Sequence, residues 1–135
     1  MSVYLTFDQS TRPLIHAYIH PIEPTQDQWN AFMTEFDDLL NGDQPFAILF
    51  DLSHAKLVSM SMVHQFATFM KAHDEQFKQK IIASAVLSNN TLVRGILDIL
   101  FTIRKPSKPN IVTKNSAKAS SFLIDACREA GVIML

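Results

Sequence analysis

Hydrophobic and polar residues alternate at the start of the chain. Apolar side chains occupy every second position over residues 3–7 and again over residues 15–19, with a turn-like stretch between them. A period of two is typical of a half-buried strand, so the pattern predicts a hairpin of two strands. The opposite face of this hairpin, which we expect helices to leave partly uncovered, carries Tyr4, Thr6, His16, Tyr18 and His20.

A helical pattern follows the hairpin. Thr25 and Gln28 have the spacing of a capping box, in which the threonine hydroxyl accepts from the amide three residues on and the glutamine side chain reaches back. The apolar residues that follow recur on one helical stripe, and Asn41-Gly42 is a candidate left-handed stop. We therefore predict a helix over this segment, with Trp29 largely buried.

Continuous apolar runs mark the strands of the rest of the chain. Residues 45–50 and 80–87 are typical of strands buried on both faces, and residues 110–113 predict a shorter one. A second helix should start at Ser59 or Ser61 and continue through Phe77. Two further helices should start near residues 90 and 115 and end at Pro106 and Gly131, respectively.

The resulting order is β-β-α-β-α-β-α-β-α. Right-handed crossovers would make the last three strands parallel, which gives a mixed sheet with an N-terminal β-hairpin followed by βα repeats. The length of 135 residues and a hydrophobic content of 47% suit one core, and no linker-like stretch divides the chain. We therefore predict a single α/β domain over residues 1–135.

Composition narrows the function classes. A formal net charge of −1 lacks the basic footprint of a general nucleic-acid binder. The N-terminus lacks the pattern of a signal peptide, no apolar run reaches membrane-spanning length, and the single cysteine suits a reducing compartment. We therefore expect a cytoplasmic protein that uses neither nucleic acid nor a membrane as its partner.

The order of elements and the segment from Ile48 to Val63, ILFDLSHAKLVSMSMV, together resemble one known family. It is the STAS family, the anti-sigma factor antagonist or SpoIIAA-like fold that also forms cytoplasmic domains of sulfate transporters. Members show an apolar strand ending in Asp-Leu, a short loop, and Asp-Ser-Ser-Gly-Leu opening a helix, with a serine there phosphorylated by a partner kinase. The resemblance implies a regulatory module that acts by binding another protein through the surface around its second helix.

The motif in this chain departs from the family pattern. Ser59 falls at the motif aspartate, Met60 at the first serine, Ser61 at the second, Met62 at the glycine and Val63 at the leucine. The resemblance makes Ser61, and after it Ser59, the candidate phospho-switch, because a phosphate is favoured at a helix start. Simple N-capping explains either serine equally well.

A second polar helix start offers a candidate anion or partner surface, which is formed by Asn89, Asn90, Thr91 and Arg94. Capping is the simpler explanation for these residues as well. His16 and His20 share a strand face without the neighbours that a metal site needs, and Cys127 takes a core-like helical position. No phosphate-binding or nucleophile motif occurs, so we expect no enzymatic activity, no metal and no cofactor.

These observations leave two function classes open. The first is a non-enzymatic regulatory or protein-interaction module of the STAS-like type, with a protein partner or a second copy as its target, since the hairpin face and the apolar C-terminal tail favour a homodimer. The alternative is a small binding protein for an apolar or lipid-like ligand, as in the similar Sec14-like fold. Core packing is the simpler role of the residues that could line its pocket, which are Met60, Met62, Phe66, Phe69, Met70, Phe101 and Ile103.

Overall fold

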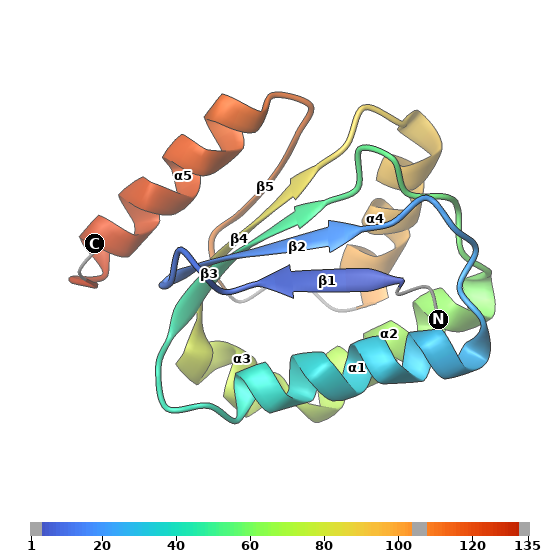
Figure 1. The fold of residues 1–135 in the computed structure, drawn as a ribbon, viewed down its shortest axis with the longest axis horizontal. Coiled ribbons are helices and arrows are strands. Elements are labelled where there is room, and N and C mark those ends of the chain that lie inside the picture. The colour runs from blue at the N-terminus through green and yellow to red at the C-terminus, as the bar shows by residue number, and fades with distance from the viewer. Residues whose placement is uncertain (1–3, 104–107, 133–135) are drawn as a thin grey trace.

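The computed structural model describes residues 4–103 and 108–132, with the side chains of residues 99–103 excepted. Its helices form two layers of unequal size on a five-stranded sheet: α5 lies alone on one face, and the other helices lie on the opposite face (Figure 1). The elements in chain order are β1 (Leu5–Asp8), β2 (Leu14–Ile19), α1 (Gln26–Leu40), β3 (Phe46–Asp51), α2 (Met60–Ala72), α3 (Asp74–Lys80), β4 (Ile81–Leu87), α4 (Thr91–Ile103), β5 (Asn110–Thr113) and α5 (Ser116–Glu129).

The strands lie in the sheet in the order in which they occur in the chain, β1-β2-β3-β4-β5. β1 and β2 form the predicted antiparallel hairpin, in which Leu5 pairs with Ile19. β2, β3, β4 and β5 are parallel, and β3 is the central strand. The predicted mixed sheet with an N-terminal hairpin is therefore confirmed, and the carboxyl ends of four parallel strands meet at one edge.

The smaller helical layer is α5. Ala119, Leu123 and Cys127 on this helix are fully buried against small residues of the sheet such as Ala47 and Ala85. α5 contacts β3, β4 and β5, and it leaves the same face of β1 and β2 uncovered. The prediction that helices do not fully cover the hairpin is correct, and so is that of a buried Cys127, whose thiol pKa is raised by burial.

The larger layer packs a group of aromatic rings between the sheet and the helices α1, α2 and α3. Phe36 is 1% exposed and lies at its centre, with ring centroids 5.5 Å from Phe77 and 5.8 Å from Phe50. The capping box at Thr25 is present, and Trp29 is 6% exposed, as predicted. This layer holds most of the buried apolar surface, and it also holds the cavity described below.

Tyr4 is the first correction to the sequence-based predictions. We expected it on the uncovered face of the hairpin, but it precedes β1 in a bend, where its carbonyl accepts from the His20 amide at 2.9 Å. Outside the strand the alternation no longer applies, and the side chain turns into the core beside Trp29. The other four residues predicted for that face are exposed or half-buried.

The predicted second helix is in fact two helices. His73 interrupts it between α2 and α3, with its ring Nδ1 2.8 Å from the Phe69 carbonyl oxygen and its Nε2 2.9 Å from Asp37 Oδ1. These contacts anchor the break to α1, and the new direction of the chain brings Phe77 against Phe36. Apolar spacing alone does not reveal such a break.

The helix ends show one further correction. Gly42 was predicted as a left-handed stop, but within the described residues only Gly131 has a positive φ, 76°. Asn41 ends α1 instead: its amide donates to the Asp37 carbonyl, and its side-chain nitrogen donates to Asp37 Oδ1 at 3.0 Å. Pro106 and the last three residues of the apolar tail lie outside the described residues. Over the described part of the chain, the helices are too short or too polar to span a membrane.

Candidate functional site

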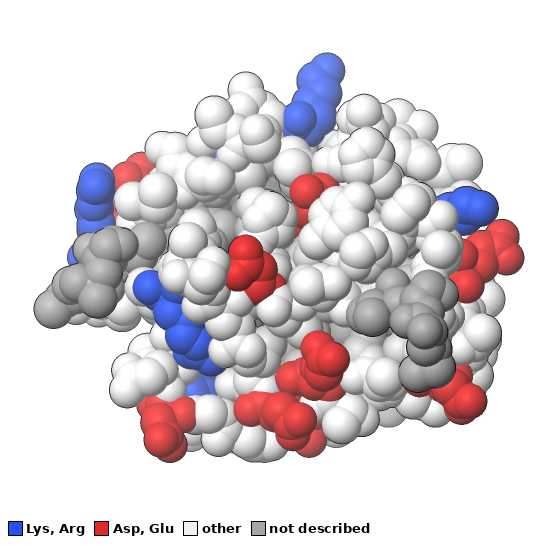
Figure 2. All heavy atoms as spheres, in the orientation of Figure 1, with Lys and Arg blue, Asp and Glu red and all other residues white. Residues whose placement is uncertain are grey.

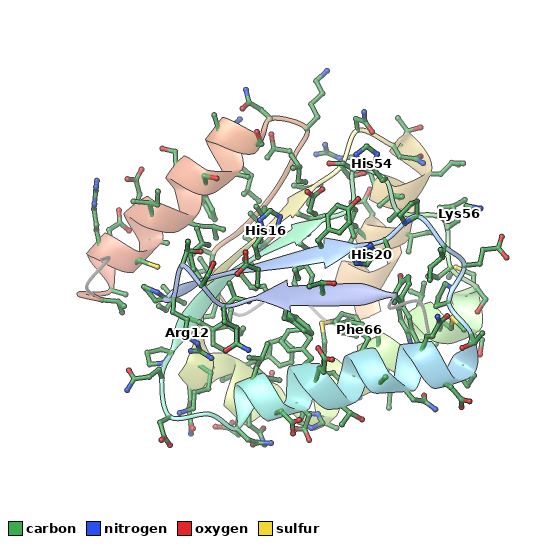
Figure 3. All side chains as sticks on the ribbon, viewed as in Figure 1. Arg12, His16, His20, His54, Lys56 and Phe66 are labelled. Carbon is green, nitrogen blue, oxygen red and sulfur yellow. The ribbon has the colours of Figure 1, made fainter. Side chains whose placement is uncertain are left out.

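A cavity of about 200 Å³ lies between the sheet and the helices α1, α2 and α4. Its walls are mostly apolar, and they include both aromatic rings and the aliphatic side chains of α4. Figure 3 shows Phe66, one of the lining residues, between the sheet and α1. The aromatic residues of the lining are Tyr4, Trp29, Phe32, Phe36, Phe50, Phe66 and Phe77.

Two features of the fold explain why this space is not filled. On the side of β4 that faces the helices, the side chains are the small Ser84 and Val86, beside Ile48 and Phe50 of β3. Above them, α4 packs against α2, and Val93, Ile96 and Leu97 form its wall of the cavity. Protein interiors contain few voids larger than a water molecule, so a cavity of this size calls for an explanation beyond ordinary packing.

The cavity wall carries polar groups without the usual partners. Trp29 Nε1 is buried and has no hydrogen-bond partner among the described residues. A buried donor without an acceptor costs ~1–3 kcal/mol. Burial also raises the pKa of Tyr4 to about 12, because the phenolate would lose its hydration. Both groups suit an occupant that brings an acceptor atom.

The charged residues in the lining are both lysines, Lys56 and Lys108, and the lining contains no aspartate or glutamate among the described residues. Lys56 belongs to the loop between β3 and α2, which also contributes Leu52, Ala55, Leu57 and Val58 to the wall. Lys56 is exposed, and Leu57 is 43% exposed although it lines the cavity. The cavity therefore reaches the surface at this loop.

The two serines predicted as a phospho-switch have different positions at the start of α2. Ser59 is the N-cap, and its hydroxyl accepts from the Met62 amide at 3.2 Å. Ser61 is exposed inside the first turn, where its hydroxyl accepts from Gln65 Nε2 at 3.4 Å, and it borders a shallow hollow with His64 and Thr68. The capping interpretation is confirmed for Ser59, and Ser61 keeps an accessible hydroxyl without a capping role.

A pair of substitutions tests this assignment. Ser59→Ala removes the cap and should lower the free energy of unfolding by about 0.5–2 kcal/mol. Ser61→Ala, the matched control two residues on, removes only an exposed side-chain contact and should change it by less than about 0.5 kcal/mol. Urea unfolding followed by circular dichroism measures both values, and a larger loss in Ser61→Ala would contradict the assignment.

The second predicted polar surface lies at the start of α4. Asn89, Asn90, Thr91 and Arg94 are all exposed there. Asn90 acts as a cap, because its Oδ1 accepts from the Leu92 amide at 2.9 Å. The structure thus brings the four residues together, and the local hydrogen bonds account for Asn90 by capping.

A polar group occupies the uncovered face of the sheet, on the opposite side from the cavity. His16 Nε2 lies 3.5 Å from Asp51 Oδ2, and the Thr6 hydroxyl lies 2.9 Å from His20 Nε2. Burial favours a higher pKa for Asp51, but hydrogen bonds from Ser53 and His16 outweigh it and the pKa is lowered. Within the described residues, no three potential ligands from His, Cys, Asp and Glu gather in a geometry that could hold a metal ion.

The residues that sequence reasoning suggested for an apolar pocket are only partly those of the cavity. Phe66 and Met70 line it, whereas Met60 is 43% exposed on the surface. Met62 and Phe69 pack in the core, and the side chains of Phe101 and Ile103 lie outside the described residues. Tyr4, Trp29 and Lys56 were missed as lining residues. The unusual density of aromatic residues in α1 was the available signal for the first two.

Comparisons with known proteins support the fold. Neither a family model nor a curated protein matches the sequence. Among solved structures, the chain is similar to an uncharacterised protein of the DUF3478 family with a SpoIIAA-like fold from Shewanella loihica PV-4. The TM-score is 0.64 at 11% sequence identity, over 88% of this chain and 91% of the other. The chain therefore has a SpoIIAA-like fold, as its sequence resemblance implied.

Proposed function

We propose that this chain is a non-enzymatic binding protein that holds a small apolar ligand in the cavity between its sheet and helices α1, α2 and α4. The observation that carries the proposal is the cavity itself, about 200 Å³ of mostly apolar space in the core. A cavity in a core forgoes the dispersion contacts that filling side chains would make, so an empty one destabilises the fold. A ligand that supplies those contacts stabilises the folded state.

The size of the cavity limits the ligand. A dry apolar cavity of about 150 Å³ is large enough to bind benzene, and pockets for drug-sized molecules span roughly 300–1,000 Å³. A cavity of about 200 Å³ lies between these values, near the lower one. The ligand body is therefore a single ring or a short alkyl chain, and a full-length acyl chain would need more room.

The shape of the lining favours the same ligand class. Trp29 and Phe32 meet edge to face with centroids 5.3 Å apart, and Phe32 stacks on Phe66 at 5.4 Å. Rigid rings in such an arrangement offer both faces and edges to an apolar guest without much loss of conformational entropy. Because Trp29 is the only tryptophan of the chain and lines the cavity, its fluorescence should report occupancy.

Ligand binding can be tested directly. Native mass spectrometry of the purified protein should show a co-purified small molecule, and titration of the ligand-free protein with toluene or 1-octanol should change the Trp29 fluorescence in a saturable way. Val86→Phe places a ring in the cavity and should weaken binding by at least about tenfold, since it occupies the space in which the guest makes its apolar contacts.

The matched control is Ala126→Phe, which adds the same ring on α5, on the other side of the sheet. It should bind both probes as the unmodified protein does. If Val86→Phe fails to fold, Val93→Phe fills the cavity from α4 instead. Absence of saturable binding by both probes to the folded, unmodified protein would rule the proposal out.

One specific observation favours a second candidate, the regulatory or protein-interaction module. Large exposed apolar side chains occur near the carboxyl ends of the parallel strands, at Leu57 (43% exposed), Met60 (43%) and Leu92 (63%), and the hydroxyl of Ser61 is accessible beside Met60. Exposed apolar groups of this kind are typical of a surface that meets a protein partner or a second copy. If this candidate alone is right, native mass spectrometry finds no co-purified small molecule.

A further inference from the structure

The polar groups around the cavity define what kind of apolar ligand it would take. Lys56 and Lys108 are the charged residues of its lining, and the lining holds no acidic side chain among the described residues. The chain as a whole has more acidic than basic residues, 13 against 12. Figure 2 shows acidic residues spread along the part of the surface formed by α1, so the cavity differs in charge from the helix that covers it.

The two lysines stand at different ends of the cavity. Lys56 lies in the β3–α2 loop, at the end of the molecule where α1 begins (Figure 3). Lys108 precedes β5, and the neighbouring Pro109 carbonyl accepts from the Ser84 amide at 3.0 Å, three residues before the carboxyl end of β4. Each lysine can lay its aliphatic stem on the apolar wall while its ammonium stays in water.

The buried donor singles out the Lys56 end. Trp29 is on the first turns of α1, its Nε1 is buried without an acceptor among the described residues, and Tyr4 packs against it with ring centroids 5.8 Å apart. An indole N–H can only donate, so an occupant satisfies it only by offering an acceptor. An acidic group offers acceptor oxygens and a charge opposite to that of the lysine.

We propose, on the basis of the function proposed above, that the ligand is an amphipathic anion. Its short apolar body lies among the aromatic rings, and its acidic head group lies at the β3–α2 loop, where Lys56 and the indole N–H of Trp29 receive it. The loop is then the mouth of the site. The exposed Leu57 beside Lys56 covers the junction between the head group and the apolar body.

The test compares probes that differ only in the head group. Octanoate, 1-octanol and octylamine are titrated separately into the full chain by isothermal titration calorimetry at neutral pH and low salt. Octanoate should bind at least about fivefold more tightly than octanol, the ratio given by one charge-assisted hydrogen bond, and octylamine should bind most weakly. High salt should reduce the preference, because the lysine is exposed.

Substitutions locate the head group. Lys56→Met keeps an apolar stem and removes the charge, so it should abolish the preference for octanoate over octanol and leave the affinity for octanol unchanged. Lys108→Met, the matched control at the other end, should keep the preference. Trp29→Phe keeps an aromatic ring but removes the N–H, and it should reduce the preference partially.

The outcomes separate this inference from the function on which it rests. Equal binding of octanoate and octanol would overturn the anionic head group and leave the apolar binding site intact. A preference that survives in Lys56→Met and disappears in Lys108→Met would overturn the assignment to the β3–α2 loop. If no probe binds to the unmodified protein, the proposed function itself is wrong.

Discussion

Replacing Phe36 with alanine is expected to lower the free energy of unfolding by about 3–5 kcal/mol. Phe36 is 1% exposed and joins α1 to three other elements through ring contacts with Phe50 of β3, Phe66 of α2 and Phe77 of α3, with centroids 5.5–6.2 Å apart. Truncation removes the buried ring and enlarges the cavity that Phe36 already borders, so the surrounding residues have little reason to collapse into the space.

Urea unfolding followed by circular dichroism measures this loss. Phe122→Ala is the matched control, because Phe122 is only partly buried, at the edge of the α5 layer. It should cost clearly less. A loss of under about 1 kcal/mol in Phe36→Ala would show that the aromatic cluster does not hold the helical layer to the sheet.

The second large effect is a loss of stability at high pH that depends on Tyr4. The pKa of its phenol is raised from 10.0 to about 12 in the folded state by burial. Below pH 10 both states keep the proton, and stability is complete. Between pH 10 and about 12 the unfolded chain ionises first, so stability falls by up to about 1.4 kcal/mol per pH unit, or ~2–3 kcal/mol in total.

The contribution of Tyr4 is isolated by comparison with Tyr4→Phe, since lysines also titrate in this range. Free energies of unfolding of both proteins should be measured from pH 8 to 12, and the difference between them should shift in favour of Tyr4→Phe as the pH rises. Tyr18→Phe, on the open face of the sheet, is the matched control. Parallel pH profiles for the unmodified protein and Tyr4→Phe would contradict the prediction.

The errors of sequence reasoning share a physical cause. Tyr4 was placed on the open face because the alternation was extended one residue beyond the strand, and His73 was overlooked because its partners, the Phe69 carbonyl and Asp37, are brought to it only by folding. Gly42 has the composition of a left-handed stop, but the side chain of Asn41 ends α1 by a local hydrogen bond. In each case a contact overrode a pattern.

The cavity lay largely beyond prediction for a related reason. Its walls come from seven elements and one loop, and its volume is the difference between the space that the backbone encloses and the space that the side chains fill. Sequence reasoning identified Phe66 and Met70 as apolar residues of the right kind, but packing against each other was the simpler expectation. That Lys56 and Trp29 serve the same cavity follows only from the crossing of α1 beneath the β3–α2 loop.

The sequence by itself determined the elements and their order. Capping at Thr25, Ser59 and Asn115 and the buried runs of β3 and β4 are local, since each depends on hydrogen bonds or periodicities within a few residues. The tertiary structure decided how these elements share space: α5 alone covers one face of β3, β4 and β5, while α4 packs on α2 above the small residues Ser84 and Val86. Whether side chains fill such a gap depends on distances between segments far apart in the chain, which no local pattern encodes.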